Sequence, residues 1–171
     1  MDLPQTTEYA LRALAHIATL PDGTLARAET VSNETGVPLH YLHKILRRLA
    51  GAGILEAKKG PGGGFALAKA PHRIRFMEIL EAMDSPMPDA CAFGWGKCDA
   101  NHPCPLHGTY SEFKNAMIGW ASKTTLADVR AYAASIGAER NSEIRRLPMA
   151  SRPGARPGKA VDAPAKKRKA K

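Results

Sequence analysis

Cysteine is scarce in this 171-residue chain, and its three cysteines are an odd number. Small secreted domains held by disulfide bonds normally carry an even number, so a closed disulfide framework is disfavoured. The sequence contains no stretch of about 18 apolar residues, the length needed to cross a membrane. Met1–Gln5 also lacks the basic start of a signal peptide. We therefore expect a soluble, cytoplasmic protein with no membrane partner, whose thiols stay reduced.

An excess of positive charge is missing from most of the chain. The formal net charge is +9, but residues 140–171 hold eleven Lys and Arg against two acidic residues, which accounts for all of it. Residues 1–139 carry 14 basic and 14 acidic residues, so charge alone does not identify a DNA-binding domain. We expect residues 138–171 to form a disordered basic tail that binds DNA without reading its sequence.

Catalytic motifs are also absent. No base–nucleophile arrangement or substrate motif accompanies the cysteines, and the six histidines are scattered. The glycine-rich run 60–64 lacks the Gly-Lys-Ser/Thr ending of a nucleotide-binding loop. We therefore expect no enzyme, and a small iron–sulfur electron carrier is the least favoured class.

All three cysteines, Cys91, Cys98 and Cys104, lie within one short segment rich in Gly and Pro. Such a segment stays irregular, so three thiolates could face one metal centre, with His107 as the obvious fourth ligand. His102 and the distant Glu8 are alternative fourth ligands. Gaps of six and five residues exceed the two to four typical of zinc sites and favour a larger cluster. A redox pair with a spare thiol, or ordinary free cysteines, are the less favoured interpretations.

Three helices are expected near the N-terminus, over residues 6–20, 28–35 and from 38 onward. Gly36 is a typical residue for ending the second helix, and Pro38 suits the first turn of the third. The third helix has one apolar stripe, and its other positions are mostly basic or aromatic. Two helices joined by such a turn indicate a helix-turn-helix, although a helix hairpin with a solvated charged face would show a similar pattern.

A β-hairpin follows, with strands expected over 54–59 and 65–68 and a glycine-rich turn over 60–64. This hairpin would be the wing of a winged helix. Four glycines would let its backbone approach a DNA groove without side-chain clashes. The candidate DNA contacts are Tyr41, His43, Lys44 and Arg47, then His40 and Arg48, on the third helix, and Lys58, Lys59, Gly60, Gly62 and Gly63 on the wing.

Four segments together resemble a known family. They are residues 7–14 (TEYALRAL), 37–42 (VPLHYL), 59–65 (KGPGGGF) and 79–84 (ILEAMD), followed by the three cysteines. They are similar to the winged-helix family that contains the iron–sulfur cluster regulator IscR and the nitric-oxide-sensitive repressor NsrR. The likeness covers about residues 1–135, and it implies a bacterial, homodimeric transcription regulator.

The resemblance also implies a cofactor. It makes Cys91, Cys98 and Cys104 the ligands of an iron–sulfur cluster, with two or four irons, and His107 or Glu8 the fourth ligand. The six-then-five spacing departs by one residue from the IscR-like pattern. The implied function is sensing of iron–sulfur, redox or nitric oxide status. The alternatives are a zinc-stabilised or thiol-switched repressor without a cluster, and an adaptor whose winged helix binds protein.

Beyond the cysteines, apolar residues repeat at coiled-coil spacing at Tyr110, Phe113, Met117 and Trp120. Such a seam is more often part of a chain's own core than an interface, but in the family it resembles the long dimerisation helix. Thr125 and Asp128 then fit a capping box for a last helix. A two-fold dimer would present two recognition helices to a roughly palindromic double-stranded DNA operator.

The expected fold is mainly α with a small β-hairpin wing: a winged helix-turn-helix plus a long dimerisation helix. Residues 1–84 would form the DNA-binding domain and 85–107 the cysteine-rich, cluster-binding loop. Residues 108–137 would form the dimerisation helix and a terminal helix, and 138–171 the basic tail.

Overall fold

The computed structural model describes residues 3–85 and 90–135. Its elements, in chain order, are α1 (Gln5–Thr19), α2 (Ala28–Thr35), α3 (Leu39–Gly51), β1 (Leu55–Lys58), β2 (Gly64–Leu67), the 3-10 helix η1 (Pro71–Arg73), α4 (Phe76–Ala82), α5 (His107–Lys123) and α6 (Leu126–Ser135). The predicted class, mainly helical with one antiparallel hairpin, is confirmed. The predicted basic tail lies outside the described residues.

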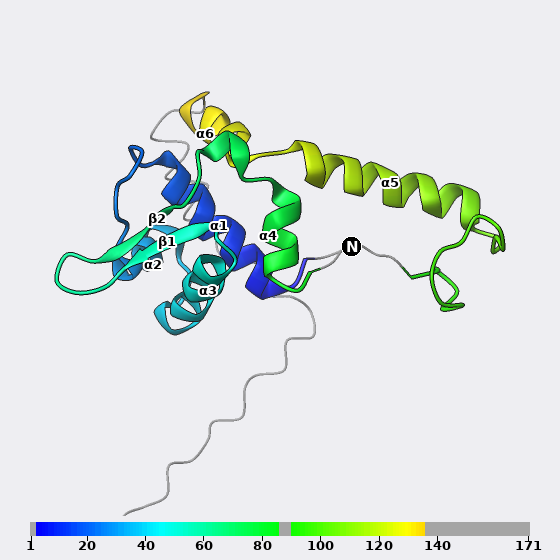
Figure 1. Ribbon diagram of the computed structural model, residues 1–171, viewed down its shortest axis with the longest axis horizontal. Coiled ribbons are helices and arrows are strands. Elements are labelled where there is room, and N and C mark those ends of the chain that lie inside the picture. The colour runs from blue at the N-terminus through cyan, green and yellow to red at the C-terminus, as the bar shows by residue number, and fades with distance from the viewer. Residues whose placement is uncertain (1–2, 86–89, 136–171) are drawn as a thin grey trace, which may run out of the picture.

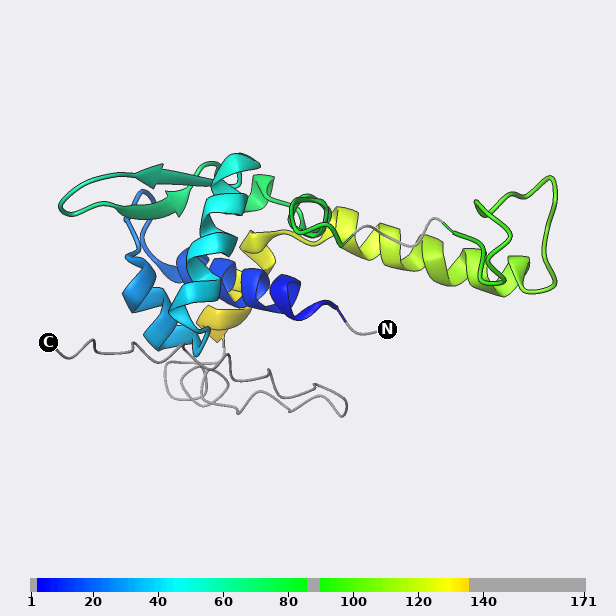
Figure 2. The ribbon, with the colours of Figure 1, turned by 90° about the horizontal axis from the view of Figure 1, so that it is seen from below.

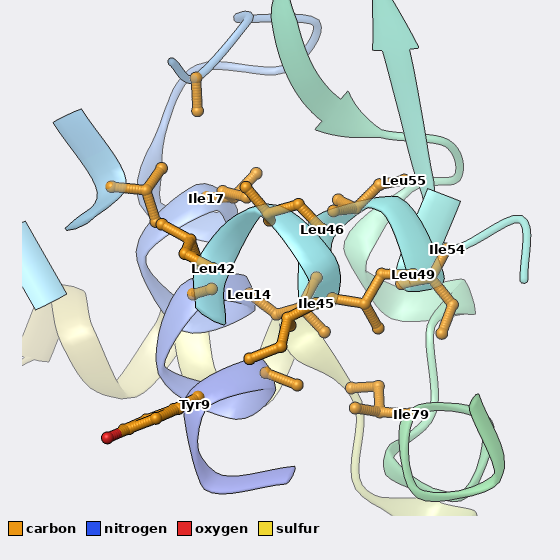
Figure 3. Packing of buried hydrophobic residues seen from close by; sticks show 14 of the residues in the cluster. Tyr9, Leu14, Ile17, Leu42, Ile45, Leu46, Leu49, Ile54, Leu55 and Ile79 are labelled. Atoms are coloured by element: carbon orange, nitrogen blue, oxygen red, sulfur yellow. The ribbon is translucent and has the colours of Figure 1, made fainter. Parts of the chain in front are cut away.

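The core forms where α1 and α3 cross. Apolar residues recur every three or four positions along both helices, so each helix presents one apolar side to the other. Figure 3 shows Leu14 and Ile17 of α1 packed beside Leu42, Ile45 and Leu46 of α3, and all five side chains are buried. Leu49, Ile54, Leu55 and Ile79 extend this cluster toward the wing and α4.

The turn between α2 and α3 follows the sequence prediction. Gly36 ends α2 with a φ of 69°, in the left-handed region that glycine adopts without steric penalty. The Ser32 hydroxyl donates a 2.6 Å hydrogen bond to the Val37 carbonyl, which closes the turn from the other side. These contacts set α3 across α1 and leave its basic side exposed.

The wing is a two-stranded antiparallel hairpin in which Leu55 pairs with Leu67 and Lys58 pairs with Gly64. A single bridge joins its second strand to the segment before α2: Ala26 and Phe65 exchange backbone hydrogen bonds of 2.8 and 2.9 Å. The wing therefore projects from the core at a fixed position (Figure 1).

Helix α5 projects away from this domain. Figures 1 and 2 show it as a long arm whose C-terminal end meets α4 and whose N-terminal end carries the segment 90–106. At the inner end, the rings of Phe76 and Trp120 pack edge to face with centroids 5.6 Å apart. The Phe76 amide also donates a 3.0 Å hydrogen bond to the Thr124 carbonyl.

After α5, the chain returns to its own winged-helix domain through α6. The predicted capping box is present: the backbone amide and the hydroxyl of Thr125 both donate to Asp128, at 2.7 and 2.8 Å. Arg130 of α6 donates to the backbone carbonyls of Ala18 and Leu20 and pairs with Asp22 at 2.7 Å. These bonds fix α6 against the C-terminal end of α1.

The sequence of residues 74–83 predicts a strand that leads into a helix, and this prediction is only partly correct. Helix α4 forms, but Ile74 and Arg75 do not belong to a strand; Arg75 makes a single antiparallel bridge with Thr125. A strand needs a partner of some length, and here only the short link between α5 and α6 runs alongside.

Candidate metal centre and nucleic-acid interface

The cysteine segment is organised by tight turns at the outer end of α5. The Cys91 amide donates a 2.7 Å hydrogen bond to the Gly96 carbonyl, and Ala90 bridges Lys97, so residues 90–97 fold back on themselves. Gly94 and Gly96 have φ angles of 73° and 87°, which explains why glycine is needed at these turns. The reversal brings Lys97, the residue before Cys98, beside Ala90, the residue before Cys91.

The three thiols and one imidazole gather in two pairs. Cys98 Sγ lies 3.5 Å from Nδ1 of His107, the first residue of α5. Cys91 and Cys104 interact through their side chains, and the charges of both Cys91 and Cys98 act on Cys104. Cys104 is buried, whereas Cys91 and Cys98 are half-buried. The four predicted donors therefore share one small region.

The surroundings shift the pKa values of the Cys91 and Cys104 thiols in opposite directions. The backbone N–H of Phe93 lowers the pKa of Cys91 by hydrogen bonding to its thiolate, with smaller help from Cys104 and Trp95. Burial raises the pKa of Cys104, and the neighbouring Cys91 and Cys98 raise it further. A thiolate at Cys104 therefore needs a nearby positive charge, which a metal ion would supply.

The other two candidates for the fourth ligand lie elsewhere. His102 is highly exposed, and its Nδ1 lies 3.0 Å from Asp99, whose pKa is lowered chiefly by that histidine. Glu8 lies on α1, and Figures 1 and 2 show α1 in the winged-helix domain, at the opposite end of α5 from the segment 90–106. Within one chain the structure brings His107 to the cysteines, and it does not bring Glu8.

The chemistry of the four donor side chains suits a metal centre. Three thiols and one imidazole are ligands that zinc and iron–sulfur clusters accept. Across residues 3–85 and 90–135, no three His, Cys, Asp or Glu side chains yet converge closely enough to hold one ion.

The candidate DNA surface is the exposed side of α3. Helical periodicity buries Leu42, Ile45, Leu46 and Leu49, so the residues between them point outward. His40, Lys44 and Arg47 are exposed and His43 is half-buried. The predicted recognition residues therefore share one face of the molecule.

Two predicted DNA contacts have partners inside the protein. The Tyr41 ring lies 6.0 Å from Tyr9 of α1 and 4.1 Å from His40, measured between centroids. Arg48 donates from Nε to the Ala82 carbonyl and pairs with Asp84, both at the end of α4. No local pattern predicted the Arg48 pairing, because its partners lie more than 30 positions away in the chain.

The wing contributes exposed cations and close backbone packing. Lys58 and Lys59 are exposed beside Gly60 and Gly62, both with positive φ. Gly63 and Gly64 are required for a different reason: a Cβ atom would lie 2.2 Å from the Lys58 carbonyl oxygen at Gly63, and 2.7 Å from that of Ala26 at Gly64.

Sequence comparison places this architecture among known proteins. The model of the Rrf2 family, described as an iron-dependent transcriptional regulator, matches residues 3–132. The chain belongs to the Rrf2 family. A protein of Aquifex aeolicus, named as an HTH-type transcriptional regulator, is 33% identical over 132 residues, which is 75% of this chain and 91% of that relative. The transcriptional regulator IscR of Escherichia coli is 26% identical over 129 residues, 75% of this chain and 80% of IscR.

Solved structures support the same fold. CymR, the global cysteine regulator of Bacillus subtilis, superposes with a TM-score of 0.67 at 17% identity, over 77% of this chain and 98% of CymR. The resemblance stated from the motifs is thus confirmed at the level of the Rrf2 family. The chain is a winged-helix, DNA-binding transcriptional regulator, and the relatives named above are regulators, not enzymes. In the described part of this Rrf2 protein, no helix is long and apolar enough to cross a membrane.

Proposed function

We propose that this Rrf2 protein is a homodimeric regulator that senses iron–sulfur, redox or nitric oxide status through a cluster held by Cys91, Cys98, Cys104 and His107. The observation that carries the proposal is the gathering of these donors at one end of α5, with Cys98 3.5 Å from His107. The relation to IscR agrees with this ligand chemistry. Iron and sulfide analysis would distinguish a cluster of two irons from one of four.

The chain's own residues would prepare the site for metal. Hydrogen bonds from the Phe93 and Trp95 amides favour a thiolate at Cys91, so this residue is the easiest first ligand. His107 presents Nδ1 toward Cys98 from the first turn of α5. A bound iron–sulfur cluster would add a redox-active group at this point. Ligation would fix the segment 90–106 to the start of α5.

A homodimer is proposed because α5 exposes apolar side chains. Phe113 and Trp120 are 48% and 46% exposed on an arm that contacts its own domain only at one end. Pairing two such arms about a two-fold axis would cover these rings, and it would place two α3 helices on half-sites of a roughly palindromic duplex. In this division, residues 1–84 read DNA, 85–107 hold the cluster and 108–137 form the dimer.

The proposal is tested by the iron and sulfide content of the purified protein and by its visible absorbance spectrum. Full-length protein purified without oxygen should contain iron and sulfide and absorb visible light. Cys98→Ala should lose that absorbance and change operator affinity, roughly 5- to 150-fold for a typical allosteric coupling. A colourless protein with one zinc per chain would instead establish the zinc-stabilised regulator.

Two histidine variants form a matched pair for the fourth ligand. His107→Ala should alter the spectrum and the nitric oxide response, whereas His102→Ala, three residues past Asp99, should leave both unchanged. If His107→Ala has no effect and Glu8→Ala does, the fourth ligand is Glu8. Since Glu8 lies far from the cysteines of its own chain, it would then have to come from the second copy.

A further inference from the structure

Arg48 is a basic residue of the recognition helix, α3, and its side chain is bonded to other groups of the same protein. Its Nε donates to the Ala82 carbonyl, and its guanidinium pairs with the Asp84 carboxylate. Lys44 lies four residues earlier on α3, and residues with this spacing are neighbours on a helix surface. Within the described residues, Lys44 and Arg47 have no hydrogen-bond or ion-pair partner, so Arg48 differs from both.

The pair is exposed enough to exchange partners. The side chains of Arg48 and Asp84 are 43% and 81% exposed. Exposed ion pairs contribute little to stability because water and salt screen them. A DNA phosphate would offer the guanidinium a charge-assisted, two-pronged partner, which is among the stronger hydrogen-bonding arrangements for arginine. Arg48 could therefore exchange Asp84 for phosphate without disturbing the core.

Asp84 itself is fixed in place. It is the one non-glycine residue with positive φ, 48°, in the described part of the chain. Its amide donates to the Glu81 carbonyl, and the next residue, Ser85, is held by a buried 2.8 Å hydrogen bond to Thr7 of α1. Because its backbone is held in place, the Asp84 carboxylate cannot follow Arg48 toward DNA. Arg48 can therefore pair with Asp84 or with a DNA phosphate, but not with both.

We propose that Asp84 withholds Arg48 from DNA, making the pair an autoinhibitory contact on the recognition helix. Releasing Arg48 adds one phosphate contact. Asp84 is also the last residue of the winged-helix domain before Ser85 and the cysteine segment. The inference concerns DNA binding and does not depend on a metal centre.

The test measures binding of the full chain to a mixed-sequence duplex of about 30 base pairs, which spans two half-sites one helical turn apart. Asp84→Gly removes the carboxylate and suits the positive φ, so the fold is retained. Asp84→Asn removes only the charge. Both should bind severalfold more tightly than the wild type. Each should also steepen the dependence of log affinity on log salt by about 1.8 for a dimer, because each protomer adds one phosphate contact and each contact contributes about 0.9.

Two controls separate this effect from a general change in charge. Glu81→Gln removes the same charge from an exposed residue near the end of α4, three positions before Asp84, and Arg48 pairs with Asp84 and not with Glu81. It should leave the salt slope unchanged. In an Arg48→Gln background, Asp84→Gly should no longer strengthen binding. The proposal is overturned if Asp84→Gly binds no more tightly than wild type, if Glu81→Gln reproduces its effect, or if the gain persists without Arg48. Circular dichroism melting of each variant verifies that it is folded.

Discussion

Gly63 lies in the turn of the wing, close to the backbone of the first strand. Its amide donates to the Gly60 carbonyl at 2.9 Å, and no side-chain atom fits between it and the Lys58 carbonyl. The glycine content of the sequence predicts the hairpin, but it does not indicate which glycine each close backbone contact requires. That depends on interatomic distances set by the pairing of Lys58 with Gly64.

Gly63→Ala should therefore destabilise the protein. Backbone atoms crowd the added methyl group, and they cannot move without breaking the turn, so we expect a loss of about 1 to 3 kcal/mol in the free energy of unfolding. Gly51→Ala is the matched control, because nothing lies within 4 Å of its added Cβ and its φ is not positive. Urea unfolding of both variants makes the comparison; equal midpoints would contradict the crowding argument.

The candidate ligands were the most predictable single residues. Clustering of Cys91, Cys98 and Cys104 is visible in the sequence, and His107 follows one turn later, where the structure places it against Cys98. The role of Arg48 was not predictable. Helical periodicity places it outside the apolar stripe, but its pairing with Asp84 depends on how α4 packs beside α3.

At the scale of elements, local signals defined the helices of the winged-helix domain well. Gly36 and the Thr125–Asp128 capping box mark helix ends through bonds within a few residues, so the sequence contains the whole signal. The return of α6 to α1 was not predictable. Arg130 reaches carbonyls more than 100 positions earlier, and no local pattern encodes that contact.

The cap of α6 gives a pH-dependent prediction. The Thr125 amide, and then its hydroxyl, lower the pKa of Asp128 in the folded protein. A lowered folded pKa means that the carboxylate stabilises the fold above its unfolded pKa, about 3.9, and that this contribution disappears as pH falls through the folded value. Asp128→Asn should therefore lower the melting temperature near neutral pH, and the difference from wild type should shrink as pH falls through the lowered folded pKa of Asp128.

Glu112→Gln on α5 serves as the control for this measurement, because it removes an exposed carboxylate without disturbing a cap. Its melting temperature should follow that of the wild type across the same pH range. A wild-type advantage over Asp128→Asn that grew on acidification would have the wrong sign for a capping carboxylate.

At the scale of the whole molecule, the arm formed by α5 is the feature that most needs a second copy. Periodicity predicted its apolar seam but could not separate an intramolecular contact from an interface. The structure divides the seam: Trp120 packs on Phe76 of its own chain, whereas Phe113 is 48% exposed further out. In the proposed dimer, residues 108–123 would therefore serve two purposes within one helix.

Phe113→Glu should convert the proposed dimer into a monomer, because a charge buried between two apolar arms would lack a partner. Tyr132→Glu is the control: Tyr132 is 59% exposed on α6, which packs against its own domain. Light scattering across a concentration series would measure both. A dimeric Phe113→Glu protein would place the interface elsewhere.

The length of α5 has a mechanical consequence. Seventeen residues make a lever of about 25 Å, at 1.5 Å of rise per residue. Tilting this lever by about 10° at its hinge beside Phe76 would sweep the thiol-bearing tip through about 4 Å. In the proposed dimer, where the two arms would be paired, the same rotation at the inner end of α5 would move each winged-helix domain relative to its partner's and so change the separation of the two α3 helices.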